Sequence, residues 1–202
     1  MFLLVFGISD IAKAQIVASE TFANFAFAPL SFVSKNNISQ YKIAQNEKDR
    51  AIEVYCTRLK NKFGDYKWSE DPCGGVHWDA KLASNNGHPL VYKVFGKGDN
   101  TTLFLGGVHP DELTPVHLAF KLARYLQENP SVYTDKNIRV VIAPLVNPDG
   151  FIRNLPSRTN ANGVDVNRNF LTYDWYHKAI STWRKSDWAR LGISLVLSKY
   201  GN

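Results

Sequence analysis

Apolar and polar positions divide the chain into a few clear elements. Residues 51–63 carry apolar side chains at helical spacing, and Gly64 follows them as a residue that can end a helix. Residues 89–96, 101–107 and 138–146 are short apolar runs bounded by turn residues, which predicts three strands. The last run is apolar almost throughout, as expected of a strand that is buried in a sheet.

A second helix is predicted between the second and third of these strands. Apolar residues keep a helical spacing from Leu113 to Leu126, with Thr114 as the expected N-cap and Pro115 at the first helical position. A strand, a helix and a strand in this order indicate a crossover unit of an α/β sheet. In such sheets ligands collect at the carboxyl ends of the strands, where His109 and Glu112 lie in this sequence.

The N-terminal part differs from the rest in its pattern of apolar and polar residues. Residues 1–14 combine a short apolar run with a small-x-small end, which favours a cleaved export signal over an ordinary hydrophobic N-terminus. We therefore expect a secreted or periplasmic protein, an N-terminal extension over residues 15–85 and a main domain over residues 86–202. Cys56 and Cys73 either pair as a disulfide in an exported chain or remain buried thiols.

Composition narrows the classes of partner. With 45% apolar residues and 13% aromatic residues, the 202-residue chain can bury a substantial core. Its net charge is +6, but the basic residues are scattered, so we expect a solvated basic surface and no nucleic-acid partner. No stretch approaches the roughly twenty apolar residues of a membrane span. The sequence does not define an oligomeric state.

The segment "LFLGGVHPDELTP" places a histidine and a glutamate at the end of the second strand. Gly106 and Gly107 allow a sharp backbone turn, and His109 and Glu112, three residues apart, can direct both side chains to one point. Neutral imidazole and carboxylate are zinc ligands. Taken alone, a histidine and a glutamate at this spacing are more often a chance pair in a polar loop.

A second block follows the third strand directly: "NPDGFIRNLPSRTNANGVDVNRNF", residues 147–170. "HPDE", "NPDG", an arginine and "GVDVNRNF" in that order closely resemble the zinc metallocarboxypeptidase family of the carboxypeptidase A type. The resemblance covers residues 89–170. It implies an α/β fold, here the N-terminal part of a mixed sheet flanked by helices, with the sheet incomplete.

The resemblance also implies roles for individual residues. His109 and Glu112 would be two of three zinc ligands, and Asp165 would hold the His109 ring from behind. Arg158 would be catalytic, stabilising the oxyanion, and would bind substrate together with Asn167 and Arg168, which would hold the terminal carboxylate. The implied activity is removal of the C-terminal residue from peptides or peptidoglycan-derived peptides.

The sequence departs from the family pattern after Phe170. The third zinc ligand and the general base of the family lie further downstream, whereas here His177 is the one histidine after this position and no glutamate follows. His177 lies too close to the block to take the ligand position, so we expect weak activity or none, and a frameshift or early stop near Lys185. A noncatalytic module that binds peptide C-termini and a zinc deacylase of acylated amino acids stay open as alternatives.

Overall fold

The structure is a computed structural model that describes residues 4–8, 43–44, 46–168 and 181. Its strands are β1 (Leu4–Ile8), β2 (Asp79–Ala83), β3 (Pro89–Phe95), β4 (Asn100–Leu105) and β5 (Ile138–Ala143). Its helices are α2 (Lys48–Asp65), α3 (Leu113–Glu128) and the single turn α4 (Pro148–Phe151), with 3-10 segments η3 (Pro130–Val132) and η4 (Val166–Arg168). The predicted helices and the three predicted strands are all present.

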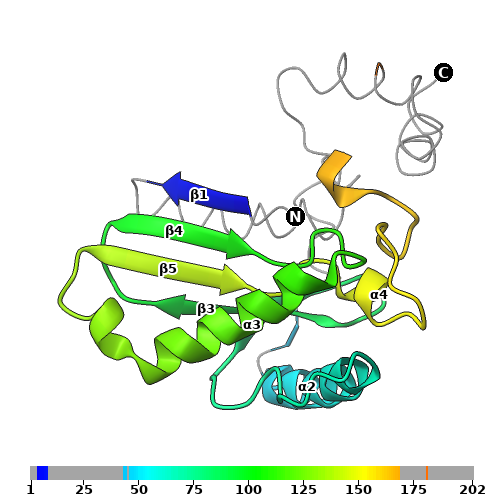
Figure 1. Ribbon diagram of the computed structural model, residues 1–202, viewed down its shortest axis with the longest axis horizontal. Helices are drawn as coiled ribbons and strands as arrows, with labels where there is room; N and C mark the ends of the chain where they lie inside the picture. The colour runs from blue at the N-terminus through cyan, green and yellow to red at the C-terminus, as the bar shows by residue number, and fades with distance from the viewer. Residues whose placement is uncertain (1–3, 9–42, 45, 169–180, 182–202) are drawn as a thin grey trace.

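The described strands form one mixed, open sheet in the order β1-β4-β5-β3-β2 (Figure 1). β4 and β5 run parallel, with Leu105 opposite Ala143, and α3 is the crossover between them. The other neighbouring strands pair antiparallel. This arrangement confirms the α/β class and the mixed sheet flanked by helices, and it brings the carboxyl ends of β4 and β5 to one edge.

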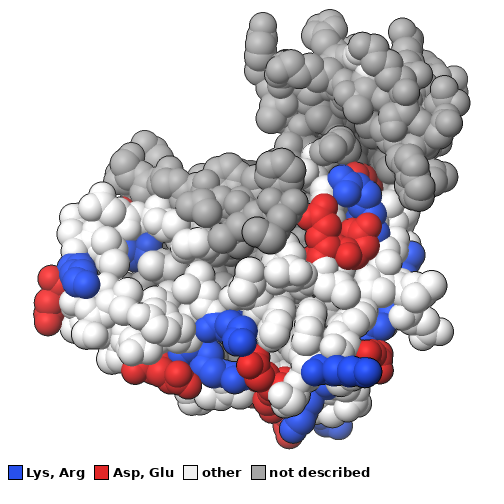
Figure 2. Space-filling model, in the orientation of Figure 1, with Lys and Arg blue, Asp and Glu red and all other residues white. Residues whose placement is uncertain are grey.

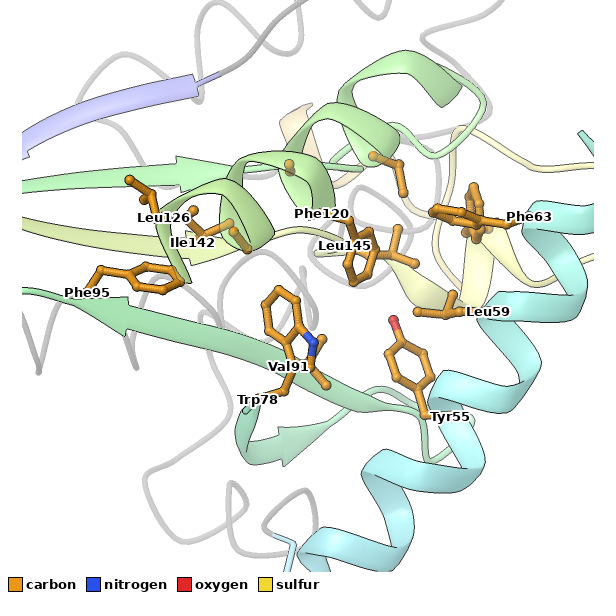
Figure 3. Close-up of a cluster of buried hydrophobic side chains, with 14 residues drawn as sticks. Tyr55, Leu59, Phe63, Trp78, Val91, Phe95, Phe120, Leu126, Ile142 and Leu145 are labelled. Carbon is orange, nitrogen blue, oxygen red and sulfur yellow. The ribbon is translucent and has the colours of Figure 1, made fainter. Parts of the chain in front are cut away.

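The main hydrophobic core lies between the sheet and two helices. α2 and α3 cover the same face of the sheet, and their apolar side chains meet those of β3 and β5 (Figure 3). Phe63 of α2 is completely buried and makes edge-to-face contacts with Phe120 of α3 and Phe151 of α4. Because such aromatic side chains bury large apolar areas, this contact fixes α2 firmly against the rest of the molecule.

Two strands, β1 and β2, were not predicted from the sequence. β2 lies in the segment expected to be an extension, and it pairs with β3 as the end strand of the sheet. Ala80 and Leu82 are buried while Lys81 between them is exposed, so buried and exposed side chains alternate along the strand. The alternation spans five residues and includes a lysine and alanines, which is too short and too weak in strand propensity to predict.

The N-terminal residues contribute a further strand. Leu4–Ile8 pairs antiparallel with β4, with Leu4 opposite Leu105. This strand lies inside the segment whose sequence favours an export signal, and the export itself stays a prediction. No helix in the described part of the chain has both the length and the hydropathy needed to cross a bilayer.

The two cysteines form a disulfide. Cys56 of α2 is bonded to Cys73, 17 residues later, so the pairing alternative applies and the free-thiol alternative does not. The closed loop is held further by Asp71, which accepts hydrogen bonds from the backbone amides of Cys73 and Gly74 and whose carbonyl accepts one from Arg124 of α3. The disulfide therefore joins α2 to a loop that also contacts α3.

The predicted start of α3 is wrong by two residues. Glu112, not Thr114, is the N-cap, and Pro115 lies in the first turn, where its missing amide hydrogen costs nothing. Glu112 makes no capping hydrogen bond with its side chain. The reason is that its carboxylate lies instead beside His109, and the turn closes through a backbone bond from the Glu112 amide to the His109 carbonyl.

Candidate metal centre

Two glycines shape the turn that follows β4. The amides of Val146 and Asn147 donate to the carbonyls of Gly106 and Gly107, so the chain segments after β4 and β5 stay paired beyond the strands. A side chain on Gly106 would collide with the Pro144 carbonyl oxygen, and Gly107 has a positive φ of 58°. The close backbone approach and the left-handed turn both require glycine here, and together they direct the next residues to the edge of the sheet.

The "NPDG" turn after β5 packs directly on the "HPDE" turn. Asn147 caps α4 by accepting a hydrogen bond from the Gly150 amide, at 3.0 Å. A Cβ atom on Gly150 would lie 2.7 Å from the Pro110 ring. The two motifs are therefore in contact through a position that tolerates no side chain, which explains why they belong to one site although 40 residues separate Pro110 from Gly150.

Asp149 links this turn to a distant part of the sheet. Its carboxylate is buried and accepts hydrogen bonds from the Ser84 hydroxyl and the Asn86 amide, both in the turn between β2 and β3. We did not predict this contact. The sequence signal, an aspartate within "NPDG", was visible, but its partner lies 65 residues away.

The loop from Arg158 to Asp165 is closed by Asn160. The side-chain oxygen of Asn160 accepts hydrogen bonds from the backbone amides of Asn162 and Val164. The backbone amide of Asn160 donates to the Val164 carbonyl. This local network folds the loop back on itself, so that Arg158 Nε lies 2.8 Å from Asp165 Oδ2. Asn160, an asparagine of a kind common in surface loops, thus positions two of the predicted site residues.

His109 stands at the centre of these turns with both ring nitrogens engaged. Its Nε2 lies 2.9 Å from Asp165 Oδ1, and its Nδ1 lies 3.3 Å from Glu112 Oε1. The side chain is 8% exposed. Because the Asp165 carboxylate accepts a hydrogen bond from Nε2, Nδ1 is the ring nitrogen whose lone pair can bind a metal, and it faces the Glu112 carboxylate.

The Arg158 guanidinium lies beside the two carboxylates that contact His109. Burial acts to raise the pKa of Asp165, but hydrogen bonds from His109 and Arg158 and the Arg158 charge outweigh it, so the pKa is lowered. Asp165 is thus an anion at neutral pH. Arg158 also lies near Glu112, with 3.7 Å between its terminal nitrogen and the carboxylate. Acidic and basic side chains meet over the start of α3 and α4 (Figure 2).

The structure brings four of the predicted site residues together: His109, Glu112, Arg158 and Asp165. Asn167 follows closely, since its backbone amide donates to Asp165 Oδ1 at 3.0 Å. Arg168 is the last residue of η4, and its side chain lies outside the described part, as do His177 and the segment around Lys185.

Comparison with known proteins agrees with this geometry. The family model of zinc carboxypeptidases matches residues 78–189, which is more than half of the chain. The chain belongs to the zinc carboxypeptidase family. Carboxypeptidase SOL1 of Arabidopsis thaliana is 36% identical over 72 residues, which cover 33% of this chain and 14% of that protein. The aligned part therefore spans a small fraction of this relative's length.

Membership of a zinc carboxypeptidase family implies zinc, so the donors must be compared with what zinc needs. A lone pair on His109 Nδ1 and the Glu112 carboxylate face each other, and this nitrogen and oxygen pair suits zinc. Asp165 behind the imidazole is the partner that such ligands require. Within the described ranges, no group of three or more histidine, cysteine or acidic side chains converges. The described residues therefore fit two positions of a zinc site.

Proposed function

We propose that this chain forms the zinc-binding and carboxylate-binding part of a zinc carboxypeptidase that removes the C-terminal residue of peptides. His109 Nδ1 and Glu112 would hold the metal, and Asp165 would fix the imidazole. The observation that carries the proposal is the arrangement of His109 between Glu112 and Asp165, with one ring nitrogen assigned to each. When bound, zinc polarises the scissile carbonyl and activates a water molecule.

Arg158 suits a role beside the scissile bond. Its Nε is used by Asp165, which orients the guanidinium, while its terminal nitrogens are not held as closely, the nearer contact to Glu112 being 3.7 Å. They retain hydrogens that can be donated to a developing oxyanion. A positioned donor of this kind contributes about 3–4 kcal/mol to transition-state stabilisation.

Asn167 and Arg168 are proposed to select chain ends. A guanidinium and an amide side by side match the two oxygens of a terminal carboxylate, and an internal peptide bond offers no such group. η4 follows Asp165 immediately, and the bond from the Asn167 amide to Asp165 fixes its start at the site. Peptides, including those of a bacterial cell wall, are the proposed substrates, and the disulfide supports a location outside the cytoplasm.

The test compares Glu112→Gln with Asp111→Asn. Both changes remove one negative charge from the same turn, but Asp111 is exposed and forms neither a hydrogen bond nor an ion pair with His109 in the described structure. We expect zinc content after equilibrium dialysis, and release of the C-terminal residue from a blocked dipeptide, to fall at least about tenfold in Glu112→Gln and to stay unchanged in Asp111→Asn. Equal zinc content in the unmodified chain and in both variants would contradict the proposal.

A noncatalytic binding module is the second candidate. The finding that favours it is that no third metal-ligating side chain joins His109 and Glu112 within the described residues. In that case, binding of a peptide with a free C-terminus would survive chelation of zinc and would be lost in Arg168→Ala. A zinc carboxypeptidase would instead lose turnover on chelation.

A further inference from the structure

A hollow of about 450 Å³ lies between α2 and the turn that joins β2 to β3, and none of the described metal centre residues lines it. Its walls are one stripe of α2 and the turn between β2 and β3, from Asn86 to Pro89. The volume falls within the range of small-molecule sites, about 300–1,000 Å³. It therefore has the size to hold a ligand of its own.

The helical wall combines apolar and basic side chains. Arg50, Val54 and Arg58 line the hollow from successive turns of α2, and Val54 is 49% exposed although it is apolar. The two arginines are eight residues apart, about 12 Å along a helix. Neither makes an ion pair or a side-chain hydrogen bond within the part of the chain that the structure describes. Glu47 is the one acidic residue in the lining.

The opposite wall presents a buried imidazole. His88 is 8% exposed, lines the hollow and packs against the Tyr55 ring, with 6.1 Å between ring centroids. Neither of its ring nitrogens makes a hydrogen bond with a described residue. Neither nitrogen is completely enclosed by the protein. A buried polar group normally has a partner, so an imidazole whose nitrogens remain accessible from the hollow is ready to bind one.

Burial and nearby charges set the protonation state of His88, and the arginines set the charge of the hollow. Burial lowers the pKa of His88, the nearby Asp149 carboxylate opposes this, and the Arg58 guanidinium lowers it further. The imidazole is therefore neutral at pH 7 and can donate one hydrogen. Two arginines against one glutamate leave the lining with a net positive charge.

We propose that this hollow binds a small organic anion, with a carboxylate or phosphate head held by Arg58 and His88 and an apolar body lying on Ala51 and Val54. Arg50 at the other end would receive a second polar or anionic group. The guanidinium fork suits both kinds of head. Nothing in the arrangement depends on zinc or on a bond being cleaved, so this site is independent of the proposed peptidase activity.

The test titrates the full chain with phenyl phosphate and with phenylacetate. We expect saturable shifts of the His88 ring signals, assigned by their absence in His88→Gln, with a dissociation constant of about 1 mM or lower for at least one probe. Isothermal calorimetry gives the same constant without the assignment. The tighter of the two probes identifies the head group, and inorganic phosphate, which lacks the apolar body, should bind at least about tenfold more weakly.

Variants decide whether the hollow is the place of binding. Arg58→Gln should weaken the tighter probe about tenfold or more, because one charge-assisted contact is lost. Lys60→Gln is the matched control, since it removes the same charge from the same helix at a position that does not line the hollow. The proposal is overturned if neither probe saturates below about 10 mM, if inorganic phosphate binds equally well, or if Lys60→Gln weakens binding as much as Arg58→Gln.

Discussion

At the scale of single residues, Asp165 decides how the metal centre is arranged. Its two carboxylate oxygens hold His109 Nε2 and Arg158 Nε, and the Asn167 amide joins them. One side chain thus orients a proposed zinc ligand, a proposed catalytic cation and the start of the segment proposed to bind the substrate carboxylate. Replacing it should disturb all three without removing any of them.

Asp165→Asn tests this. The amide can no longer accept a hydrogen bond with full negative charge, so the imidazole loses both its tautomer preference and part of its basicity. We expect zinc affinity, measured by competition with a chromogenic chelator, to fall about 10- to 100-fold. An affinity equal to that of the unmodified chain would show that Asp165 serves packing alone.

Glu70 provides a second residue-scale prediction. Hydrogen bonds from His117 and Lys121 are the main causes that lower its pKa, against the opposing effect of burial. A carboxyl whose pKa is lower in the folded state stabilises the fold at pH values above its unfolded pKa, and this contribution disappears as the pH falls through the folded pKa. The stabilisation should therefore be present at pH 6 and lost at pH values well below 4.5.

Urea unfolding of Glu70→Gln at several pH values measures the stabilisation that the Glu70 carboxylate provides. Because Glu70 and its partners His117 and Lys121 are partly exposed, the variant should be less stable at pH 6 by at most about 1 kcal/mol, and the difference should disappear as the pH falls through the lowered pKa of Glu70. Glu53→Gln, which changes an exposed acid elsewhere without an ion-pair partner among described residues, should show no such pH dependence. A difference that stayed constant with pH would contradict the assignment to Glu70.

At the scale of elements, the contact between the two turns is the feature on which the site depends. Gly150 allows α4 to lie against Pro110. In Gly150→Ala the new methyl group would meet the Pro110 ring and two backbone carbonyls at 2.7 Å, so one turn must move. We expect a loss of about 1–3 kcal/mol in the free energy of unfolding, measured with urea.

Gly64→Ala is the control for that prediction. Gly64 lies in α2, and a Cβ atom there meets nothing within 4 Å. The same substitution should leave stability unchanged or raise it by up to about 1 kcal/mol, because alanine is the better helix former. Similar losses in both variants would mean that the turn contact has no special importance.

The sequence predicted the elements with strong periodicity and missed those that depend on distant partners. α2, α3 and the strands β3, β4 and β5 carry their own apolar patterns, and "HPDE" and "GVDVNRNF" carry the site. β2 is only a weak pattern until β3 lies beside it. Asp149 and Asn160 look like loop residues, since their roles appear only when Ser84 and the Val164 amide are placed next to them.

At the scale of the whole molecule, α2 and β2 belong to the same core as the strands that carry the site. Tyr55, Leu59, Phe63 and Trp78 are all buried in the cluster shared with α3. Burying four such side chains contributes on the order of 6–12 kcal/mol, comparable to the net stability of an ordinary domain. Residues before position 86 are thus part of what holds the described structure together.

A shortened chain tests this directly. Residues 86–202 lack α2 and β2, so we expect no cooperative urea transition and strong binding of a hydrophobic dye, in contrast to the full chain. A sharp transition with the same denaturant dependence as the full chain would show that residues 15–85 form a separable extension, as their sequence texture suggested.

The pairing of β1 with β4 bears on how the protein is processed. Removal of residues 1–14 by a signal peptidase would detach Leu4–Ile8. One side of β4 would then have backbone amide and carbonyl groups without hydrogen-bond partners from β1. The same five residues cannot be both a discarded leader and a permanent strand. N-terminal sequencing of the protein from its native host therefore decides whether β4 is covered from within the chain or is left open to a strand from elsewhere.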